Sequence, residues 1–196
     1  MGILHKLHYS FRWLFQPHFL AGEKAEQHFE ELCGLNGYIV ERISQDKKSF
    51  AKYASNTLNS IKRGDFIVRN LKNAEVEVKC FSQRRYGSTK CYVIKYRHLK
   101  RHEEMQRLTG EPIIFAFFER KGRNVVENSL RMIPLRELIP PSRRNRAAFY
   151  DERIKCLCIP VDAMYSEFEY FEKYKSRISG TKSSNTPMYS YIQQRI

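Results

Sequence analysis

The chain has 196 residues, and its 35 Lys and Arg against 21 Asp and Glu give a formal charge of +14. Hydrophobic residues make up 42% of it, which is enough for one packed core and excludes a wholly disordered chain. The sequence contains no run of 18 apolar residues that could cross a membrane. The charge favours a polyanionic partner, with nucleic acid first and an anionic membrane surface second.

The cysteines indicate a reducing environment. They are odd in number and widely spaced along the chain, at Cys33, Cys80, Cys91, Cys156 and Cys158. This spacing argues against a disulfide framework. The first residues also lack the apolar segment and cleavage site of a secretory signal. We therefore expect a cytoplasmic protein.

The basic excess is concentrated in one quarter of the chain. Residues 61–110 carry thirteen Lys and Arg and five Asp and Glu, a net charge of +8. A charge that served only solubility would be spread more evenly, so we interpret this segment as a binding patch. The alternative is that these side chains are ordinary solvated ones.

Residues 1–16 place apolar residues at helical spacing and predict an amphipathic N-terminal helical arm, residues 1–19, which ends near Pro17. We expect the arm to pack on the domain or on a second subunit. Contact with a membrane surface is the less favoured alternative.

The rest of the chain alternates between strand and helix patterns. Residues 64–70 and 74–81 predict a β-hairpin, and the apolar run 112–118 predicts a strand buried on both faces. Residues 44–62 are polar and show no clear pattern. Four further strands, at 38–43, 91–94, 123–133 and 153–160, and four helices, at 20–34, 96–109, 134–139 and 167–175, complete the prediction. Together they predict an α/β domain over residues 20–175, with a central mixed β-sheet flanked by helices, and a polar flexible tail over 176–196.

The hairpin carries three side chains of the types that take part in catalysis and metal binding. Because side chains alternate along a strand, Glu77 and Lys79 share one face of the sheet. Asp65 joins them if it pairs with Glu77, which requires a three-residue loop at 70–72 or a five-residue loop at 69–73.

Two adjacent carboxylates repel each other, but they form a hard-oxygen site for Mg²⁺ or Mn²⁺. Such a metal binds a phosphate oxygen and lowers the pKa of a bound water. Lys79 would then orient or deprotonate that water. The pattern predicts metal-dependent cleavage of phosphodiesters, with Asp65 and Glu77 as metal ligands. The alternative is an exposed polar face of a hairpin without chemistry.

Asp65 followed by Glu77-Val78-Lys79 resembles the signature of the PD-(D/E)XK nuclease superfamily, which has the restriction-endonuclease-like fold. The order of the predicted elements is similar too, and residues 22–26 resemble the first-helix motif of the family. The resemblance covers about residues 20–120 and is closest to the Holliday-junction-resolvase-like branch. Two features depart from the family pattern: Gly64 stands where Pro is common, and residues 44–62 form a long insert.

The resemblance implies a nuclease with a divalent metal, DNA favoured over RNA as substrate, and a homodimer. It also implies that Glu26 contributes to the metal site and that the carbonyl of Val78 is a further ligand. We expect the basic residues beyond the hairpin to bind phosphates: Arg84, Arg85, Lys90, Lys95, Arg97, Lys100 and Arg101.

Three alternatives remain open at this point. The same fold could serve as a nucleic-acid-binding or assembly subunit without catalysis. A membrane-surface protein that uses residues 1–16 and the basic tail is less favoured. His98 and His102 have a spacing that can hold Zn²⁺, but no third ligand is evident, so we interpret their helix as one that faces phosphate.

Overall fold

The computed structural model describes residues 17–43, 61–139 and 148–180. The predicted arm over residues 1–16, most of the unassigned segment 44–62 and the end of the chain from residue 181 lie outside the described residues.

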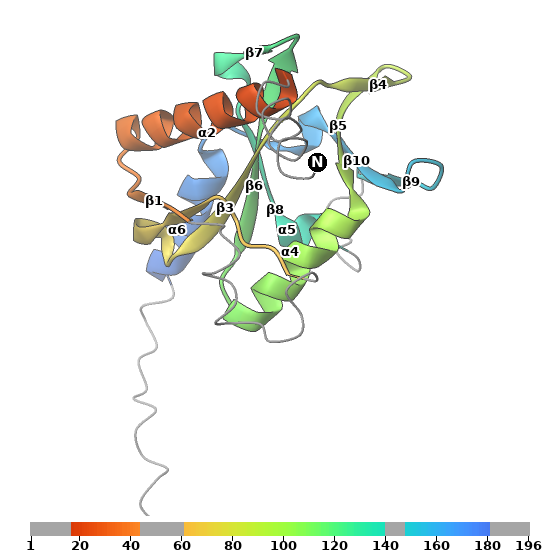
Figure 1. The fold of residues 1–196 in the computed structure, drawn as a ribbon. Coiled ribbons are helices and arrows are strands. Elements are labelled where there is room, and N and C mark those ends of the chain that lie inside the picture. Colours follow the sequence, from red (N-terminus) through yellow and green to blue (C-terminus); the bar gives the residue numbers. More distant parts are fainter. Residues whose placement is uncertain (1–16, 44–60, 140–147, 181–196) are drawn as a thin grey trace, which may run out of the picture.

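A mixed β-sheet forms the centre of the molecule (Figure 1). Its strands follow the order β1-β2-β3-β6-β8-β11, with β7 paired to β6. Only β3 and β6 run parallel among these pairs. The strands are β1 (Val40–Arg42), β2 (Phe66–Val68), β3 (Ala74–Phe81), β6 (Ile113–Lys121), β7 (Asn124–Val125), β8 (Arg131–Pro134) and β11 (Tyr165–Ser166). The predicted α/β fold with a central mixed sheet is confirmed.

Different layers cover the two faces of this sheet (Figure 1). Helices α2 (Pro17–Leu35) and α6 (Glu169–Gly180) pack on one face. The other face is covered by α4 (Tyr96–Thr109), by the short helix α5 (Leu135–Leu138) and by a second sheet. Strand β6 is buried on both faces, as predicted, because side chains from Ile113 to Phe118 alternate between the two cores.

The second sheet has four strands in the order β4-β5-β10-β9. They are β4 (Arg84–Tyr86), β5 (Thr89–Lys95), β10 (Cys156–Pro160) and β9 (Phe149–Asp151). Tyr92 stacks on Phe117 of the central sheet, with ring centroids 4.9 Å apart. Aromatic packing of this kind attaches the second sheet to the first.

The β2–β3 hairpin has the register that the candidate site requires. Phe66 lies opposite Val76 and Val68 lies opposite Ala74, so the loop consists of residues 69–73. These include the 3₁₀ turn η1 (Arg69–Leu71). The five-residue alternative is therefore the correct one. This register keeps Phe66, Val76 and Val78 in one core and leaves the opposite face of β3 to its charged residues.

Several segments differ from the prediction. Strands β4, β9 and β11 were not predicted, and β10 begins at Cys156 instead of residue 153. The predicted strand 123–133 is divided into β7, the 3₁₀ turn η2 (Glu127–Ser129) and β8, because Ser129 Oγ accepts the N–H of Glu119 at 2.8 Å and holds a turn between the two strands. Helix α2 begins at Pro17, three residues before the predicted start at residue 20, in keeping with the preference of proline for a first helical turn. Helix α6 continues to Gly180 instead of ending at residue 175.

All five cysteines are buried and free. Among the described residues, no helix is long and apolar enough to span a membrane.

Gly64 stands where the two hairpin strands approach most closely. A Cβ at this position would lie 2.8 Å from the carbonyl oxygen of Val76. Backbone cannot yield as a side chain would, so only glycine fits without a shift of the strand. This contact explains why the residue before Asp65 is glycine in this chain.

Gly64→Ala is expected to lower the free energy of unfolding by about 1–3 kcal/mol, the usual cost of overpacking. Chemical denaturation measures this change. Gly22→Ala is the matched control: the position lies within α2, and a Cβ there would meet no atom within 4 Å, so alanine should raise stability by up to about 1 kcal/mol. Equal effects of the two substitutions would contradict the steric argument.

Candidate active site

Asp65 lies at the start of β2, against the middle of β3. Its Oδ2 accepts the backbone N–H of Val78 at 2.8 Å, and its own N–H donates to the carbonyl of Val76 at 2.7 Å. Burial and the repulsion of Glu77 raise the pKa of Asp65 to about 6, although Lys79 and Lys62 act in the opposite direction. A proton can therefore leave this carboxyl group near neutral pH.

Glu77 is the most buried acid of the site, with no exposed surface. Its Oε1 forms ion pairs with the ammonium groups of both Lys79 and Lys62, and His102 Nε2 lies 3.6 Å from the same oxygen. Burial alone would raise the pKa of Glu77, but the two lysines, together with the nearby ring of His102, outweigh it and lower the pKa well below its usual range. Glu77 is therefore a buried anion.

The second oxygen of Glu77 is left without a hydrogen bond. Glu77 Oε2 is buried and has no hydrogen-bond partner within the part of the chain that the structure describes. Buried polar atoms nearly always have a partner. A hard cation would supply one, because carboxylate oxygen is the ligand type that Mg²⁺ prefers. In this respect the residues present fit a divalent metal.

Lys79 shares the face of β3 with Glu77, as the alternation of side chains predicts. Besides its ion pair with Glu77, its Nζ donates to the carbonyl of Val78 at 3.1 Å. Burial opposes the charge of Lys79, but Glu77 and Asp65 outweigh it and raise the pKa. Lys79 is therefore an ammonium ion at neutral pH, and the predicted Val78 carbonyl lies beside it.

Glu26 stands apart from this cluster. It belongs to α2, and its Oε2 accepts a hydrogen bond from Arg42 at 2.6 Å. Its charge still raises the pKa of Asp65 and of Lys79, which places it near the same end of the sheet. Across residues 17–43, 61–139 and 148–180, no three His, Cys, Asp or Glu side chains are grouped closely enough to hold a metal. The structure thus brings Asp65, Glu77 and Lys79 together, while Arg42 binds Glu26.

His102 and Lys62 belong to the cluster but were missed in the sequence. His102 has no exposed surface, and its ring packs edge-on against Phe115 with centroids 5.1 Å apart. The expectation that its helix faces phosphate is wrong for this residue. His102 has helical spacing with Leu99 and Met105, which are buried, and this spacing is the sequence feature that indicates its burial.

A second buried ion pair holds the segment that leads into the site. Arg63 donates from Nε and Nη2 to Glu75 Oε1 at 2.9 and 2.7 Å. The other oxygen of Glu75 accepts the N–H of Gly64 at 2.8 Å. The backbone N–H of Lys62 in turn donates to the carbonyl of Arg101 on α4 at 3.1 Å. These bonds fix the position of the chain just before Asp65, and with it the approach of Lys62 to Glu77.

The predicted phosphate-binding residues are all exposed, and they lie on β4, β5 and α4: Arg84, Arg85, Lys90, Lys95, Arg97, Lys100 and Arg101. Two of them, Lys95 and Arg97, act on His98 of α4. Burial, together with Lys62, Arg97, Lys79 and Lys95, lowers the pKa of His98 to about 4. Burial is the largest cause of this shift, and the four cations add a positive potential that favours a polyanion.

Asp65→Asn is expected to stabilise the fold at pH 7. The pKa of Asp65 near 6 exceeds its ordinary value of 3.8, so the folded state binds this proton more tightly and loses stability as the pH rises from about 4 through 6. The variant escapes that loss, which is at most about 3 kcal/mol. Asparagine can still accept the N–H of Val78.

Chemical denaturation with EDTA present, at pH 4 and at pH 7, measures this gain, which should be close to zero at pH 4. The exposed Asp162 provides the control, since Asp162→Asn should change stability by no more than about 0.5 kcal/mol at either pH. A gain of equal size at both values of pH would contradict the assignment of the effect to the charge of Asp65.

Comparison with known proteins gives a likeness of fold. No model of a protein family matches the sequence, and no curated protein matches it. Among solved structures, the chain is similar to Hjc, a Holliday junction resolvase of Archaeoglobus fulgidus. The identity is 11%, the match covers 74% of this chain and 95% of that one, and the TM-score is 0.44. A likeness at this level concerns the course of the chain and says nothing of activity.

Proposed function

We propose that this protein is a divalent-metal-dependent nuclease that hydrolyses phosphodiester bonds, with DNA favoured as substrate. The observation that carries the proposal is the buried charge cluster on β3: Asp65, Glu77 and Lys79 converge, and a fully buried oxygen of Glu77 has no hydrogen-bond partner among the described residues. Perturbed acids beside a lysine are typical of sites that carry out chemistry.

Each side chain of the cluster has a proposed role. Asp65 and Glu77 would hold Mg²⁺ or Mn²⁺, with Glu26 and the Val78 carbonyl as the further candidates. When bound, the metal supplies positive charge to the phosphate and lowers the pKa of a water. Lys79, held as an ammonium ion by Glu77, orients that water and stabilises the negative charge that develops on the phosphate. His102, whose Nε2 lies 3.6 Å from Glu77 Oε1, would help to position the Glu77 carboxylate.

The surroundings support a nucleic-acid substrate. Exposed basic side chains lie on β4, β5 and α4, and α4 also carries His102, which lies beside Glu77. Contacts of this kind neutralise phosphates and position a strand without reading its sequence. A homodimer, as implied by the resemblance to resolvase-like enzymes, is part of the proposal.

Glu77→Gln and Lys79→Met should each reduce Mg²⁺-dependent cleavage by at least about 100-fold, since removal of one charge-stabilising group in an active site costs about 3 kcal/mol. The assay uses a panel of duplex, single-stranded, flap and four-way-junction DNA, together with RNA. Glu41→Gln is the matched control, because Glu41 lies exposed on the edge strand β1 and pairs with Arg69. Circular dichroism establishes that each variant is folded.

Cleavage by folded Glu77→Gln protein at the wild-type rate would overturn the proposal. So would wild-type protein that cuts no member of the panel with either Mg²⁺ or Mn²⁺.

Metal binding can be measured without activity. Mg²⁺ at 100 times its Kd should stabilise the wild-type fold by about 2.7 kcal/mol, which corresponds to a rise of roughly 5–10 °C in Tm for a chain of this size. Glu77→Gln should lose most of this rise, and Glu41→Gln should keep it. An identical rise in all three proteins would place the metal elsewhere.

One observation favours a second candidate function, a nucleic-acid-binding subunit without catalysis. Two lysines, Lys62 and Lys79, already neutralise the single acidic oxygen Glu77 Oε1. A site whose acid is balanced by ammonium groups can be retained for its fold and charge alone. This candidate predicts tight DNA binding with no cleavage by the wild-type protein.

A further inference from the structure

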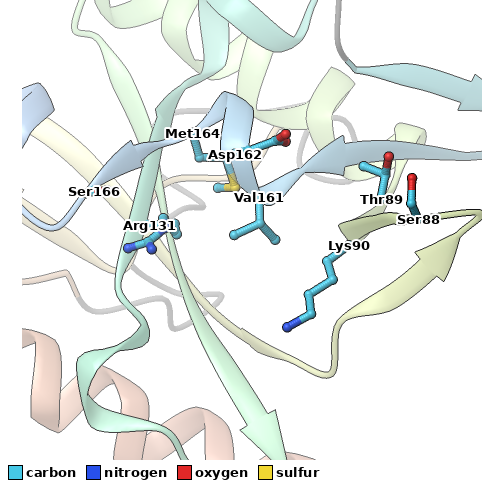
Figure 2. A pocket seen from close by; sticks show the side chains of 8 residues that line it. All are labelled: Ser88, Thr89, Lys90, Arg131, Val161, Asp162, Met164 and Ser166. Carbon is cyan, nitrogen blue, oxygen red and sulfur yellow. The ribbon is translucent and has the colours of Figure 1, made fainter.

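We propose that a polar pocket between the two sheets, formed around Lys90 and Arg131, binds a second phosphate of the nucleic-acid strand. The inference rests on the proposed function and names a subsite for the strand beside the cleavage site. The pocket has a volume of about 480 Å³ and lies where β5 of the second sheet meets β8 and β11 of the central one (Figure 2).

Strand register places the pocket on the same face as the catalytic cluster. Lys79 of β3 pairs with Phe117 of β6, and Phe117 pairs with Arg131 of β8. Paired residues of neighbouring strands direct their side chains to the same face. Lys79, Phe117 and Arg131 therefore form one row across the sheet. Arg131 in turn pairs with Ser166 of β11, which also lines the pocket.

The second sheet supplies the other wall. Tyr92 of β5 is buried against Phe117, in the middle of the row. Lys90 is two residues earlier on the same strand, so it belongs to the same face of β5 as Tyr92. Figure 2 shows the Lys90 side chain extending from β5 into the space toward the strand that carries Arg131. The apolar contact between the sheets thus ends in a polar pocket.

The two cations of the pocket are available to a ligand. Within the described ranges the side chain of Lys90 forms no ion pair or hydrogen bond, although its backbone pairs with β4. The side chain of Arg131 donates one hydrogen bond there, from Nη1 to the carbonyl of Leu130 at 3.0 Å. Asp162 is the only acid of the lining, and in Figure 2 its carboxylate points away from the Lys90 ammonium. The hydroxyl groups of Ser88 and Thr89 add donors at the rim. A phosphate matches this set of two cations and hydroxyl groups.

The spacing fits a strand that runs from the cluster to the pocket. Neighbouring strands lie about 4.8 Å apart, so the backbones at Lys79 and Arg131 are separated by roughly 10 Å. One strand of B-form DNA carries a phosphate every 3.4 Å or so along the helix axis. Because phosphates also wind about that axis, this rise sets an upper limit, and the pocket would hold a phosphate no more than about three nucleotides from the one that is cut.

The binding test compares the salt dependence of the Kd for a single-stranded and a duplex oligonucleotide, with EDTA present. The variants are Lys90→Gln, Arg131→Gln and the double substitution. Because the two cations hold one phosphate, the double variant should bind about tenfold more weakly. Its slope of log K against log salt should fall by about 0.9 on duplex or 0.7 on single strands. Lys175→Gln, on α6 at the other face of the sheet, is the control.

Arg131→Lys should retain the wild-type slope, which distinguishes lost charge from a disturbed fold. A second arm replaces single phosphates of the strand with neutral methylphosphonates. Replacement at one position within about three nucleotides of the cut should weaken wild-type binding, and it should not weaken binding by the double variant. Equal sensitivity of the two proteins at every position, or an unchanged slope, overturns the subsite. If the wild-type protein cleaves DNA but the slope of the double variant is unchanged, the subsite is wrong and the nuclease proposal stands. If the slope changes but the wild-type protein cleaves nothing, the nuclease proposal is wrong and the subsite stands.

Discussion

The charge of one carboxylate that is wholly removed from water governs the arrangement around β3. Glu77 has no exposed surface, and an isolated ion in that position would cost far more free energy than a fold of this size can supply. Lys79 from the same strand, Lys62 from the preceding segment and His102 from α4 all turn toward it. Three separate parts of the chain are thus held together by the need to neutralise one group.

The hairpin decides whether this arrangement can carry out chemistry. A loop of five residues places Asp65 against Glu77 and Val78, whereas a loop of four would have turned it to the opposite core. The close approach at Gly64 and the ion pair between Arg63 and Glu75 reinforce that register. As a result, the pKa of Asp65 is raised and the pKa of the neighbouring Glu77 is lowered. Sites that carry out proton transfer or metal binding often contain such pairs.

Local patterns in the sequence were sufficient for much of the fold. Alternating valines identified β3, the apolar run identified β6, and Gly110 marked the end of α4. Long-range contacts were not accessible in this way. Nothing near Lys62 signals that its side chain reaches Glu77, because that contact depends on how the segment before Asp65 packs against α4. The division of residues 123–133 likewise depends on a hydrogen bond from Glu119 to Ser129.

The structure shows which cations of the basic segment 61–110 pair with acids. Glu75 and Glu77 are neutralised by Arg63, Lys62 and Lys79, all inside or beside the site. The remaining glutamates pair along α4 with Lys100 and Arg107. The cations of the segment that form no ion pair within the described residues are Lys72, Arg84, Arg85, Lys90, Lys95, Arg97 and Arg101. Apart from Lys72 they lie on β4, β5 and the first turns of α4. The net charge of the segment is therefore a property of one surface, and the charges within the fold largely cancel one another.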